Sequence, residues 1–487
     1  MYNEGYYESE RVPTRGAHPV ARKCDIGPPD PPILGGTAAL PQTWGPGGYL
    51  RSSIMPTTLL TSRIEKTIRA KRTPALPAEF VLPHYEGLSL ANIGPTVAEL
   101  LGGSIPGGVA MPGDVWADMA PGVRRVVMVL LDAVGYDRFL DVLNDESLVF
   151  RRLADAGHLF PLTSVFPSTT TAVLTSLWTG RTPAEHGLVG YVLFLREFGV
   201  TTDMIRLIPR GRDKRGTGKD TLLDWGLKPD EFLPVPGLAQ SLADDGIVTR
   251  SLLRKEYVNS FLSQLHYRGV AELRGHLDSP DMWVCLREML QAHRDERLFL
   301  TAYWGAVDTI SHDRGPQSPH WDAALRNLAY SLEREFLSQL TPADREGTLL
   351  IVTADHGQIV TPLERTVYLK QHPALYETLV MSPTGEPRVP YLHVRSGHVD
   401  AVKSYFADHL AHSFVALNAE TVLSSGLLGR EPIAPAVPHR LGDVVAIARD
   451  DWILYDRPKE PDMIGRHGGL TPGEMLVPLL MVRLDAL

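Results

Sequence analysis

The chain has 487 residues, which exceeds the size at which one hydrophobic core usually stops growing, so we expect one large domain with a subsidiary one. Hydrophobic residues make up 44% and charged residues 22% of the sequence, values typical of a soluble globular protein. The formal net charge of −9 argues against a general nucleic-acid binder, which normally carries a basic patch, but is compatible with a small phosphate substrate held by a local cationic centre.

The N-terminal stretch MYNEGYYESERVPTRG carries acidic side chains and no apolar run, so it does not resemble a secretory signal. No segment approaches the roughly 20 apolar residues that a membrane-spanning helix needs. The only cysteines are Cys24 and Cys285, which argues against a disulfide framework and favours a reducing compartment. Together these features predict a cytoplasmic protein without a membrane segment.

Residues 1–54 are rich in Gly, Pro and Tyr, as in DIGPPDPPILGG, and we expect a disordered or poorly ordered leader. Translation could also start at Met55, so the sequence leaves open whether this leader belongs to the native protein. Residues 55–123 are mostly irregular and are expected to pack on the core as an extension. Within them, TVAELLGG (96–103) predicts a short helix closed by glycine.

Three apolar runs, each ending in an aspartate, mark the core from Arg124 onward. RRVVMVLLDAVG contains Asp132, RLFLTAYWGAVD ends in Asp308, and GTLLIVTADHG contains Asp355. Unbroken apolar runs of this length are typical of strands buried on both faces of a parallel sheet. In such sheets ligands bind outside the carboxyl ends of the strands, where these aspartates lie.

Helical patterns such as SPHWDAALRNLAYSLEREFLSQL (318–340) lie between the predicted strands. Strands that alternate with helices predict an α/β fold, doubly wound, with a mostly parallel sheet sandwiched by helices. We assign this core to residues 124–365 and 441–487. Residues from about 196 to 295 are charged and helix-prone and resemble an insertion, and residues 366–440 predict a small α/β cap subdomain.

Six acidic and imidazole side chains lie at or just beyond the predicted strand ends. They are Asp132, Asp308, His312, Asp355, His356 and His467. In DTISH, Asp308 and His312 are four residues apart and share one face if the segment is helical. Asp355 and His356 are adjacent at a strand end, where a turn lets both reach one ion, and His467 lies beside glycines that allow close backbone approach. Each could be a structural residue by itself, so the prediction depends on the whole set.

Mixed aspartate and histidine ligation suits Zn²⁺ or Mn²⁺ and fits a site for Ca²⁺ alone poorly. Six such ligands suffice for two ions at roughly 4 Å separation, an arrangement that stabilises the attacking and leaving oxygens of an in-line displacement. The sequence therefore predicts two divalent metal ions, with zinc as the first choice and manganese as the second.

Four hydroxyl residues in FPSTTTAVLTSLWTG (166–180) precede a stretch with helical spacing. The start of that helix would present free N–H groups and the positive end of the dipole, which favour a bound phosphate. A threonine is a weak nucleophile unless a metal ion or base activates its hydroxyl. One of the four, Ser168 or Thr169, is also expected to cap the helix.

The motifs LLDAVGYD, FPSTTTAVLTSLWTGRTPAEHGLVGY, WGAVDTISH, VTADHG and RHGG occur in this order within residues 124–487. In this the chain resembles the alkaline phosphatase superfamily, and within it the nucleotide pyrophosphatase/phosphodiesterase branch. The resemblance implies that Thr170 is the nucleophile and forms a covalent phospho-threonine, which a metal-activated water hydrolyses. It also implies one zinc on Asp132, Thr170, Asp355 and His356, and a second on Asp308, His312 and His467.

The leading hypothesis is a two-metal hydrolase of phosphodiester or pyrophosphate bonds in a small phosphate-containing substrate, such as a nucleotide. Phosphomonoester hydrolysis at the same site is an alternative, as is a metal-binding homologue without turnover. Tyr191 and Phe194, after the predicted nucleophile helix, are candidate surfaces for a flat leaving group, although both could be core residues. Neither the physiological substrate nor the oligomeric state follows from the sequence.

Overall fold

The computed structural model describes residues 59–210, 218–456 and 462–487. The predicted leader, residues 1–54, and the first four residues of the predicted extension lie outside the described residues. No helix in these ranges is both long and apolar enough to cross a membrane. The described residues belong to one compact unit.

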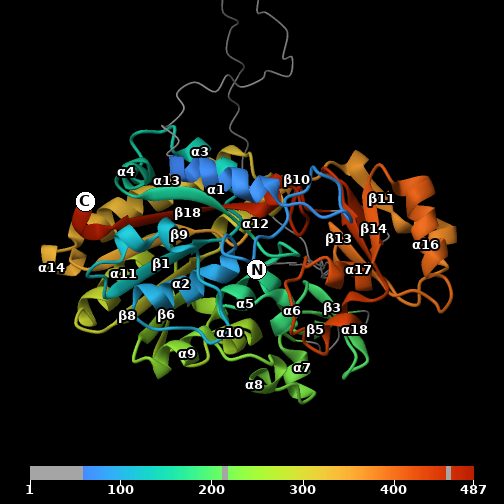
Figure 1. The fold of residues 1–487 in the computed structure, drawn as a ribbon, viewed down its shortest axis with the longest axis horizontal. Helices are drawn as coiled ribbons and strands as arrows, with labels where there is room; N and C mark the ends of the chain where they lie inside the picture. Colours follow the sequence, from blue (N-terminus) through green and yellow to red (C-terminus); the bar gives the residue numbers. More distant parts are fainter. Residues whose placement is uncertain (1–58, 211–217, 457–461) are drawn as a thin grey trace, which may run out of the picture. The chain divides into compact units, whose positions relative to one another are not determined.

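A seven-stranded sheet in the order β2-β18-β9-β1-β8-β6-β7 forms the centre of this unit (Figure 1). Its strands are β1 (Arg125–Leu131), β2 (His158–Thr163), β6 (Val248–Arg254), β7 (Glu272–His276), β8 (Leu298–Trp304), β9 (Thr348–Thr353) and β18 (Leu476–Arg483). The five strands from β9 to β7 run parallel to one another, and only β18 pairs antiparallel, with β2 and β9. The predicted mostly parallel α/β fold is confirmed.

The helices of the described residues connect and cover these strands. They are α1 (Leu59–Ala70), α2 (Ile93–Leu100), α3 (Tyr136–Val142), α4 (Val149–Ala156), α5 (Thr170–Leu177), α6 (Pro183–His186), α7 (Thr221–Asp224), α8 (Pro229–Phe232), α9 (Leu238–Asp244), α10 (Phe261–His266), α11 (Ser279–Ala292), α12 (Ala306–Arg314), α13 (Pro319–Ser331), α14 (Pro342–Arg345), α15 (Pro373–Tyr376), α16 (Val399–Tyr405), α17 (Ala419–Ser424), α18 (Val437–Leu441) and α19 (Pro472–Met475). In the view of Figure 1, α4 and α13 lie above the central strands and α9 and α10 lie below them. This arrangement explains why every residue of β1, β8 and β9 is buried and why these strands consist of unbroken apolar runs.

A second sheet of seven strands has the order β14-β15-β13-β12-β3-β4-β5, with antiparallel pairing throughout. Its strands are β3 (Val192–Leu195), β4 (Val200–Asp203), β5 (Ile208–Pro209), β12 (Thr384–Glu386), β13 (Val389–Leu392), β14 (Phe414–Asn418) and β15 (Val444–Ala448). Two short ladders join β10 (Ile359–Val360) to β17 (Gly465–Arg466) and β11 (Thr366–Tyr368) to β16 (Ile453–Tyr455). The second sheet thus combines strands from residues 192–209, which follow α5 and α6, with strands from residues 384–448.

Two local features differ from the sequence-based expectation. Strands β6 and β7 fall within the stretch that resembles an insertion, yet both pair into the central sheet. The predicted helix over 318–340 is regular only to Ser331, because a π-turn at Leu332–Phe336 and a 3₁₀ turn at Leu337–Gln339 follow it. The parallel register of β1 with β8 and β9 still brings all three carboxyl ends to one rim.

Candidate metal centre

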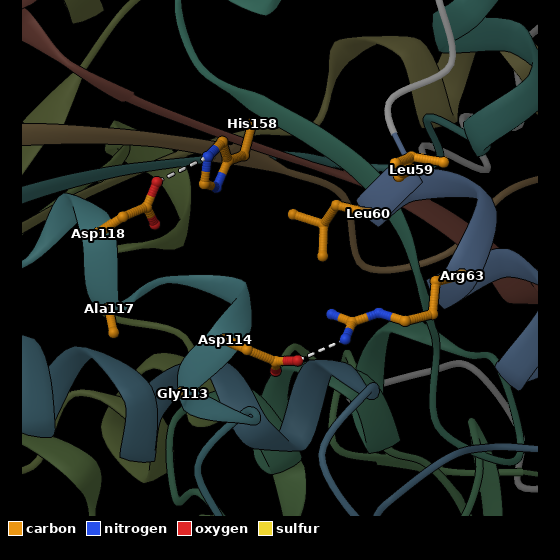
Figure 2. Close-up of a pocket in the computed structure, with 8 residues that line it drawn as sticks. All are labelled: Leu59, Leu60, Arg63, Gly113, Asp114, Ala117, Asp118 and His158. Carbon is orange, nitrogen blue, oxygen red and sulfur yellow. Dashed lines mark hydrogen bonds and ion pairs between the residues drawn. The ribbon is translucent and has the colours of Figure 1, made fainter.

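A pocket of about 500 Å³ lies between α1, the turns at Gly113–Val115 and Ala117–Met119, and the start of β2 (Figure 2). An ion pair of Arg63 with Asp114 at 2.5 Å borders it, and Nε2 of His158 lies 3.1 Å from a carboxylate oxygen of Asp118. None of the residues that line this pocket is a predicted ligand or nucleophile. The predicted chemistry lies instead at the carboxyl-end rim of the central sheet.

All six acidic and imidazole side chains predicted as ligands at this rim are buried. Their exposed fractions are 3% for Asp132, 5% for Asp308, 4% for His312, 0% for Asp355, 0% for His356 and 7% for His467. Asp132 directly follows β1, and its N–H donates to the carbonyl of Trp304 at the end of β8 at 3.0 Å. Asp355 and His356 follow β9. Buried charged groups normally pair or bind metal ions, so a cluster of this kind requires an explanation.

Asp132, Asp355 and His356 form the first group, with ligand atoms within 4.8 Å of one another. Nε2 of His356 lies 3.5 Å from Oδ1 of Asp132 and 3.4 Å from Oδ2 of Asp355. The other oxygen of each carboxylate is occupied, since Asp355 accepts from the N–H of Ala133 at 3.0 Å and Asp132 accepts from the hydroxyl of Tyr303. Oδ1 of Asp132 and Oδ2 of Asp355 have no hydrogen-bond partner in the part of the chain that the structure describes.

Asp308, His356 and His467 form the second group within the same distance limit. Helix α12 brings Nε2 of His312 to 3.2 Å from Oδ1 of Asp308, as the four-residue spacing predicts. Nε2 of His467 lies 3.8 Å from the same oxygen. The rings of His356 and His467 stack with centroids 3.7 Å apart, so His356 belongs to both groups and not only to the first.

The three imidazoles share one kind of polar contact at Nδ1, and Nδ1 of His312 also lies 2.9 Å from Nε2 of Gln358. In each ring Nδ1 faces a backbone carbonyl, that of Gly465 at 2.8 Å for His312 and that of Ser168 at 3.0 Å for His467. Nδ1 of His356 faces the carbonyl of its neighbour Gly357 at 3.1 Å. An Nδ1–H that donates to a carbonyl leaves the lone pair on Nε2, which is the arrangement of metal-binding histidines.

The electrostatics of the cluster agree with cation binding. Burial raises the pKa of Asp355 to about 6, and the carboxylate of Asp308 adds to this shift. Burial also raises the pKa of Asp132 well above its ordinary range, and the carboxylates of Asp355 and Asp308 add to that shift. Burial lowers the pKa of His356 to about 4 and that of His467 to about 3, so both rings are neutral at neutral pH. For Asp308 burial alone would raise the pKa, but the rings of the two nearest histidines outweigh it and hold the pKa low. Neutral imidazoles fit divalent metal ions, as do carboxylate oxygens that no other described residue binds.

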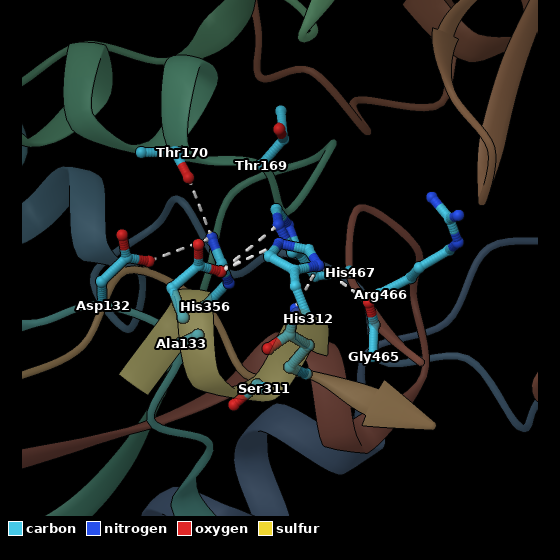
Figure 3. A network of polar contacts seen from close by, with 12 residues as sticks. Asp132, Ala133, Thr169, Thr170, Ser311, His312, His356, Gly465, Arg466 and His467 are labelled. Atoms are coloured by element: carbon cyan, nitrogen blue, oxygen red, sulfur yellow. Dashed lines mark hydrogen bonds and ion pairs between the residues drawn. The ribbon is translucent and has the colours of Figure 1, made fainter. Parts of the chain in front are cut away.

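The four hydroxyl residues before and in α5 have different environments. Ser168 donates to the carbonyl of Gly469 at 2.8 Å, and Thr171 is buried without a hydrogen-bond partner among the described residues. Thr169 occupies the N-cap position, but its side chain makes no cap hydrogen bond. Thr170, the first residue of α5, is the one of the four that is not buried. Its hydroxyl lies 3.2 Å from Nε2 of His356, and Figure 3 shows it pointing to the cluster.

The structure places Phe194 in β3 of the second sheet and Tyr191 directly before that strand. The hydroxyl of Tyr191 donates to Asp203, and the guanidinium of Arg210 lies 5.7 Å from the centre of its ring. The ring of Phe194 packs edge-on against His393, with centroids 5.6 Å apart. These contacts occupy part of each side chain. A role of Tyr191 and Phe194 in substrate binding stays a prediction.

Two residues near the cluster were not identified from the sequence. Tyr303 contacts Asp132, and Glu386 accepts a hydrogen bond from Thr169. A phenol among the last residues of an apolar run that ends at the rim was a weak signal for Tyr303. Nothing in the sequence pointed to Glu386, because it lies 217 positions from Thr169.

A family model described as type I phosphodiesterase/nucleotide pyrophosphatase matches residues 126–470. Human ectonucleotide pyrophosphatase/phosphodiesterase 5 is 17% identical, with 73% of this chain and 87% of that chain covered at a TM-score of 0.54. An inactive form of the murine protein in complex with AMP shares 17% identity over the same fractions, at 0.53. Phosphonoacetate hydrolase from Sinorhizobium meliloti 1021 in complex with phosphonoformate shares 18% identity over 75% and 94% of the chains, at 0.54. No curated protein matches the sequence.

Proposed function

The chain belongs to the type I phosphodiesterase/nucleotide pyrophosphatase family of phosphoric ester hydrolases, and we propose that it hydrolyses phosphodiester or pyrophosphate bonds of nucleotide-type substrates through Thr170. Family membership confirms the resemblance predicted from the motifs. The observation that carries the proposal is the position of the Thr170 hydroxyl, the one of the four that is not buried, 3.2 Å from Nε2 of His356. It lies beside buried carboxylate oxygens that have no hydrogen-bond partner among the described residues.

We assign the buried cluster to two divalent cations, zinc by preference because the donors are mixed nitrogen and oxygen atoms. One ion would be held by Asp132, Thr170, Asp355 and His356, and the other by Asp308, His312 and His467. When bound, two such cations supply positive charge to the phosphate oxygens and lower the pKa of a coordinated hydroxyl. His356 lies in both groups of potential ligands and therefore could contact either ion.

In the proposed reaction the Thr170 oxygen, after loss of its proton, attacks phosphorus and displaces the leaving-group oxygen. The product is a phospho-threonine, and water then cleaves its phosphorus–oxygen bond and regenerates the hydroxyl. Thr170 starts α5, and the N–H groups in the first turn of a helix have no acceptor within the helix. We propose that these N–H groups bind the non-bridging phosphate oxygens.

The known ligands of the similar structures support a small phosphate-type substrate. The murine protein was solved with AMP, and the bacterial hydrolase with phosphonoformate. We favour a nucleotide-type diester or pyrophosphate, with Tyr191 and Phe194 as candidate surfaces for the leaving group. Monoester hydrolysis at the same site is the second candidate.

The test compares hydrolysis of bis-p-nitrophenyl phosphate with that of the mono-ester, together with elemental analysis of bound metal. We expect turnover of the diester, loss of turnover after chelation, and its recovery with Zn²⁺. A strong preference for the mono-ester would favour the second candidate. Bound metal without turnover of any phosphate ester would favour a non-catalytic homologue.

A further inference from the structure

Glu386 is a buried carboxyl group beside the proposed nucleophile that the reaction described above does not use. It ends β12 and is 8% exposed. Its Oε1 accepts two hydrogen bonds, from the hydroxyl of Thr169 at 2.6 Å and from the N–H of Tyr191 at 3.2 Å. Burial raises the pKa of Glu386 to about 7, and the bond from Thr169 and the charges of Arg210 and Arg466 oppose this shift. In either protonation state Oε1 can accept both bonds.

The hydroxyl of Thr169 bonds to Glu386, although an N-cap hydroxyl usually bonds to a backbone N–H group of its own helix. The backbone of Thr169 is extended, with φ −124° and ψ 142°, but the side chain caps no N–H group of α5. It is committed to Glu386 instead. Since Thr170 is the next residue, the carboxyl group of Glu386 fixes the backbone from which the proposed nucleophile projects.

The same carboxyl side chain lies against the loop that carries His467. A Cβ atom at Gly468, whose φ is +117°, would lie 3.0 Å from Cγ and 3.1 Å from Cβ of Glu386. The N–H of Ser168 donates to the carbonyl of Gly468 at 3.3 Å, and the N–H of Gly468 donates to Oγ of Ser168 at 3.2 Å. Glu386 thus packs where Ser168, just before the proposed nucleophile, contacts Gly468 in the loop that carries His467.

Two residues further along the chain, Arg388 connects the β12–β13 hairpin to the His467 loop a second time. Its Nε donates to Oε1 of Glu474 at 2.9 Å and one terminal nitrogen donates to Oε2 at 2.8 Å, with both side chains fully buried. Oε1 of Glu474 also accepts from the N–H of Gly469 at 2.8 Å. The hairpin therefore binds both loops of the site, through Glu386 on one and through Arg388 and Glu474 on the other.

We propose that Glu386 is a positioning residue for the hydrolysis: by holding Thr169 it orients the Thr170 hydroxyl toward the cluster of proposed metal ligands. The β12–β13 hairpin, which carries Glu386, is then part of the active site. The inference rests on the proposed function, because it requires Thr170 to be the nucleophile. Displacement of a reacting group by about 1 Å can lower the rate by about 100-fold. A residue that acts only on orientation changes kcat and leaves substrate binding largely intact.

The test measures kcat and KM for bis-p-nitrophenyl phosphate together with bound metal. Glu386→Ala should lower kcat by about 10- to 100-fold, with KM within about twofold and metal content retained. Glu386→Gln keeps an acceptor oxygen and should stay within about threefold of the wild-type kcat. Thr169→Val removes the hydroxyl with little change of shape and should lower kcat as Glu386→Ala does. The double variant should be no slower than either single one, because both break the same hydrogen bond.

Glu377→Ala is the matched control, since Glu377 is exposed and belongs to the same part of the chain, and it should behave as wild type. An unchanged kcat in Glu386→Ala, or additive losses in the double variant, would overturn the inference. If Glu386→Ala does not fold, Thr169→Val decides the question alone. Thr170→Ala separates the two levels: full activity in that variant refutes the proposed function, whereas its inactivity beside a fully active Thr169→Val refutes only the positioning role.

Discussion

The hydroxyl of Tyr303 donates a hydrogen bond to Oδ2 of Asp132, across the two neighbouring strands β8 and β1. This bond fixes the carboxylate so that Oδ1, which has no hydrogen-bond partner in the described ranges, faces Nε2 of His356 at 3.5 Å. Groups that orient a metal-binding carboxylate affect metal affinity without touching the ion. Tyr303 is therefore a candidate support for the metal centre.

Tyr303→Phe should weaken metal binding by about 10- to 100-fold, because the carboxylate of Asp132 loses the hydrogen bond that orients it. Competition titration with a chromophoric chelator measures this affinity directly. Tyr330→Phe is the control, since Tyr330 is 65% exposed. Equal affinity in both variants would show that Tyr303 does not orient the ligand.

Replacement of the Thr170 hydroxyl should abolish turnover and keep the fold. Thr170→Val removes the proposed nucleophile and preserves the side-chain shape, so we expect kcat to fall by roughly 10³-fold or more, about 4 kcal/mol of transition-state stabilisation. Thr171→Val is the matched control, because that hydroxyl is buried and has no described hydrogen-bond partner. A wild-type rate in Thr170→Val would refute the mechanism in which threonine is the nucleophile. Rates at saturating substrate and elemental analysis check both variants.

Metal affinity should decrease in acid. Burial and like charge raise the pKa of Asp355 to about 6 and that of Asp132 above its ordinary range, so at pH 5 the metal-free site holds protons that a cation must displace. His356 and His467, with pKa values lowered by burial to about 4 and about 3, take up protons only in stronger acid. Affinity should therefore rise between pH 5 and 7. Competition titrations at several pH values check this, and an affinity that is constant across that range would contradict the assignment of these carboxylates.

Much of the rim could be predicted from the sequence because its signals are local. The aspartates follow apolar runs, and burial of those runs in a parallel sheet brings their carboxyl ends together. The four-residue spacing of Asp308 and His312 needs only one helical turn, which α12 provides. Their convergence in space is observed, whereas their roles as ligands stay predictions.

The features that the sequence analysis missed depend on tertiary contacts or on a mixed strand pattern. In β6, Arg250 interrupts the apolar run, and it is tolerated there because it pairs with Glu272 and Glu296 at 3.2 Å each. A strand next to the sheet edge is only partly buried, so it lacks the unbroken apolar run that identified β1. The N-cap of α5 depends on a tertiary contact: Glu386, which accepts the hydrogen bond of Thr169, lies in a hairpin 217 positions away in the sequence.

Glu386 should make stability depend on pH in a direction opposite to that of most acidic residues. Burial raises the pKa of its carboxyl to about 7, above the ordinary value of 4.5, so between these two pH values the folded chain binds a proton that the unfolded chain releases. The unfolding free energy therefore falls as pH rises through this window, and the loss is complete above pH 7 and absent below 4.5.

Glu386→Gln cannot titrate and should gain stability relative to wild type between pH 5 and 8, by at most about 3 kcal/mol. Melting temperatures of both proteins, recorded with a chelator present so that metal occupancy does not vary, measure this difference; the exposed Glu377→Gln should show none. If the melting temperatures of Glu386→Gln and wild type differ by the same amount at pH 5 and at pH 8, the carboxyl group is ionised throughout. Arg210 and Arg466 would then stabilise its charge more strongly than burial disfavours it.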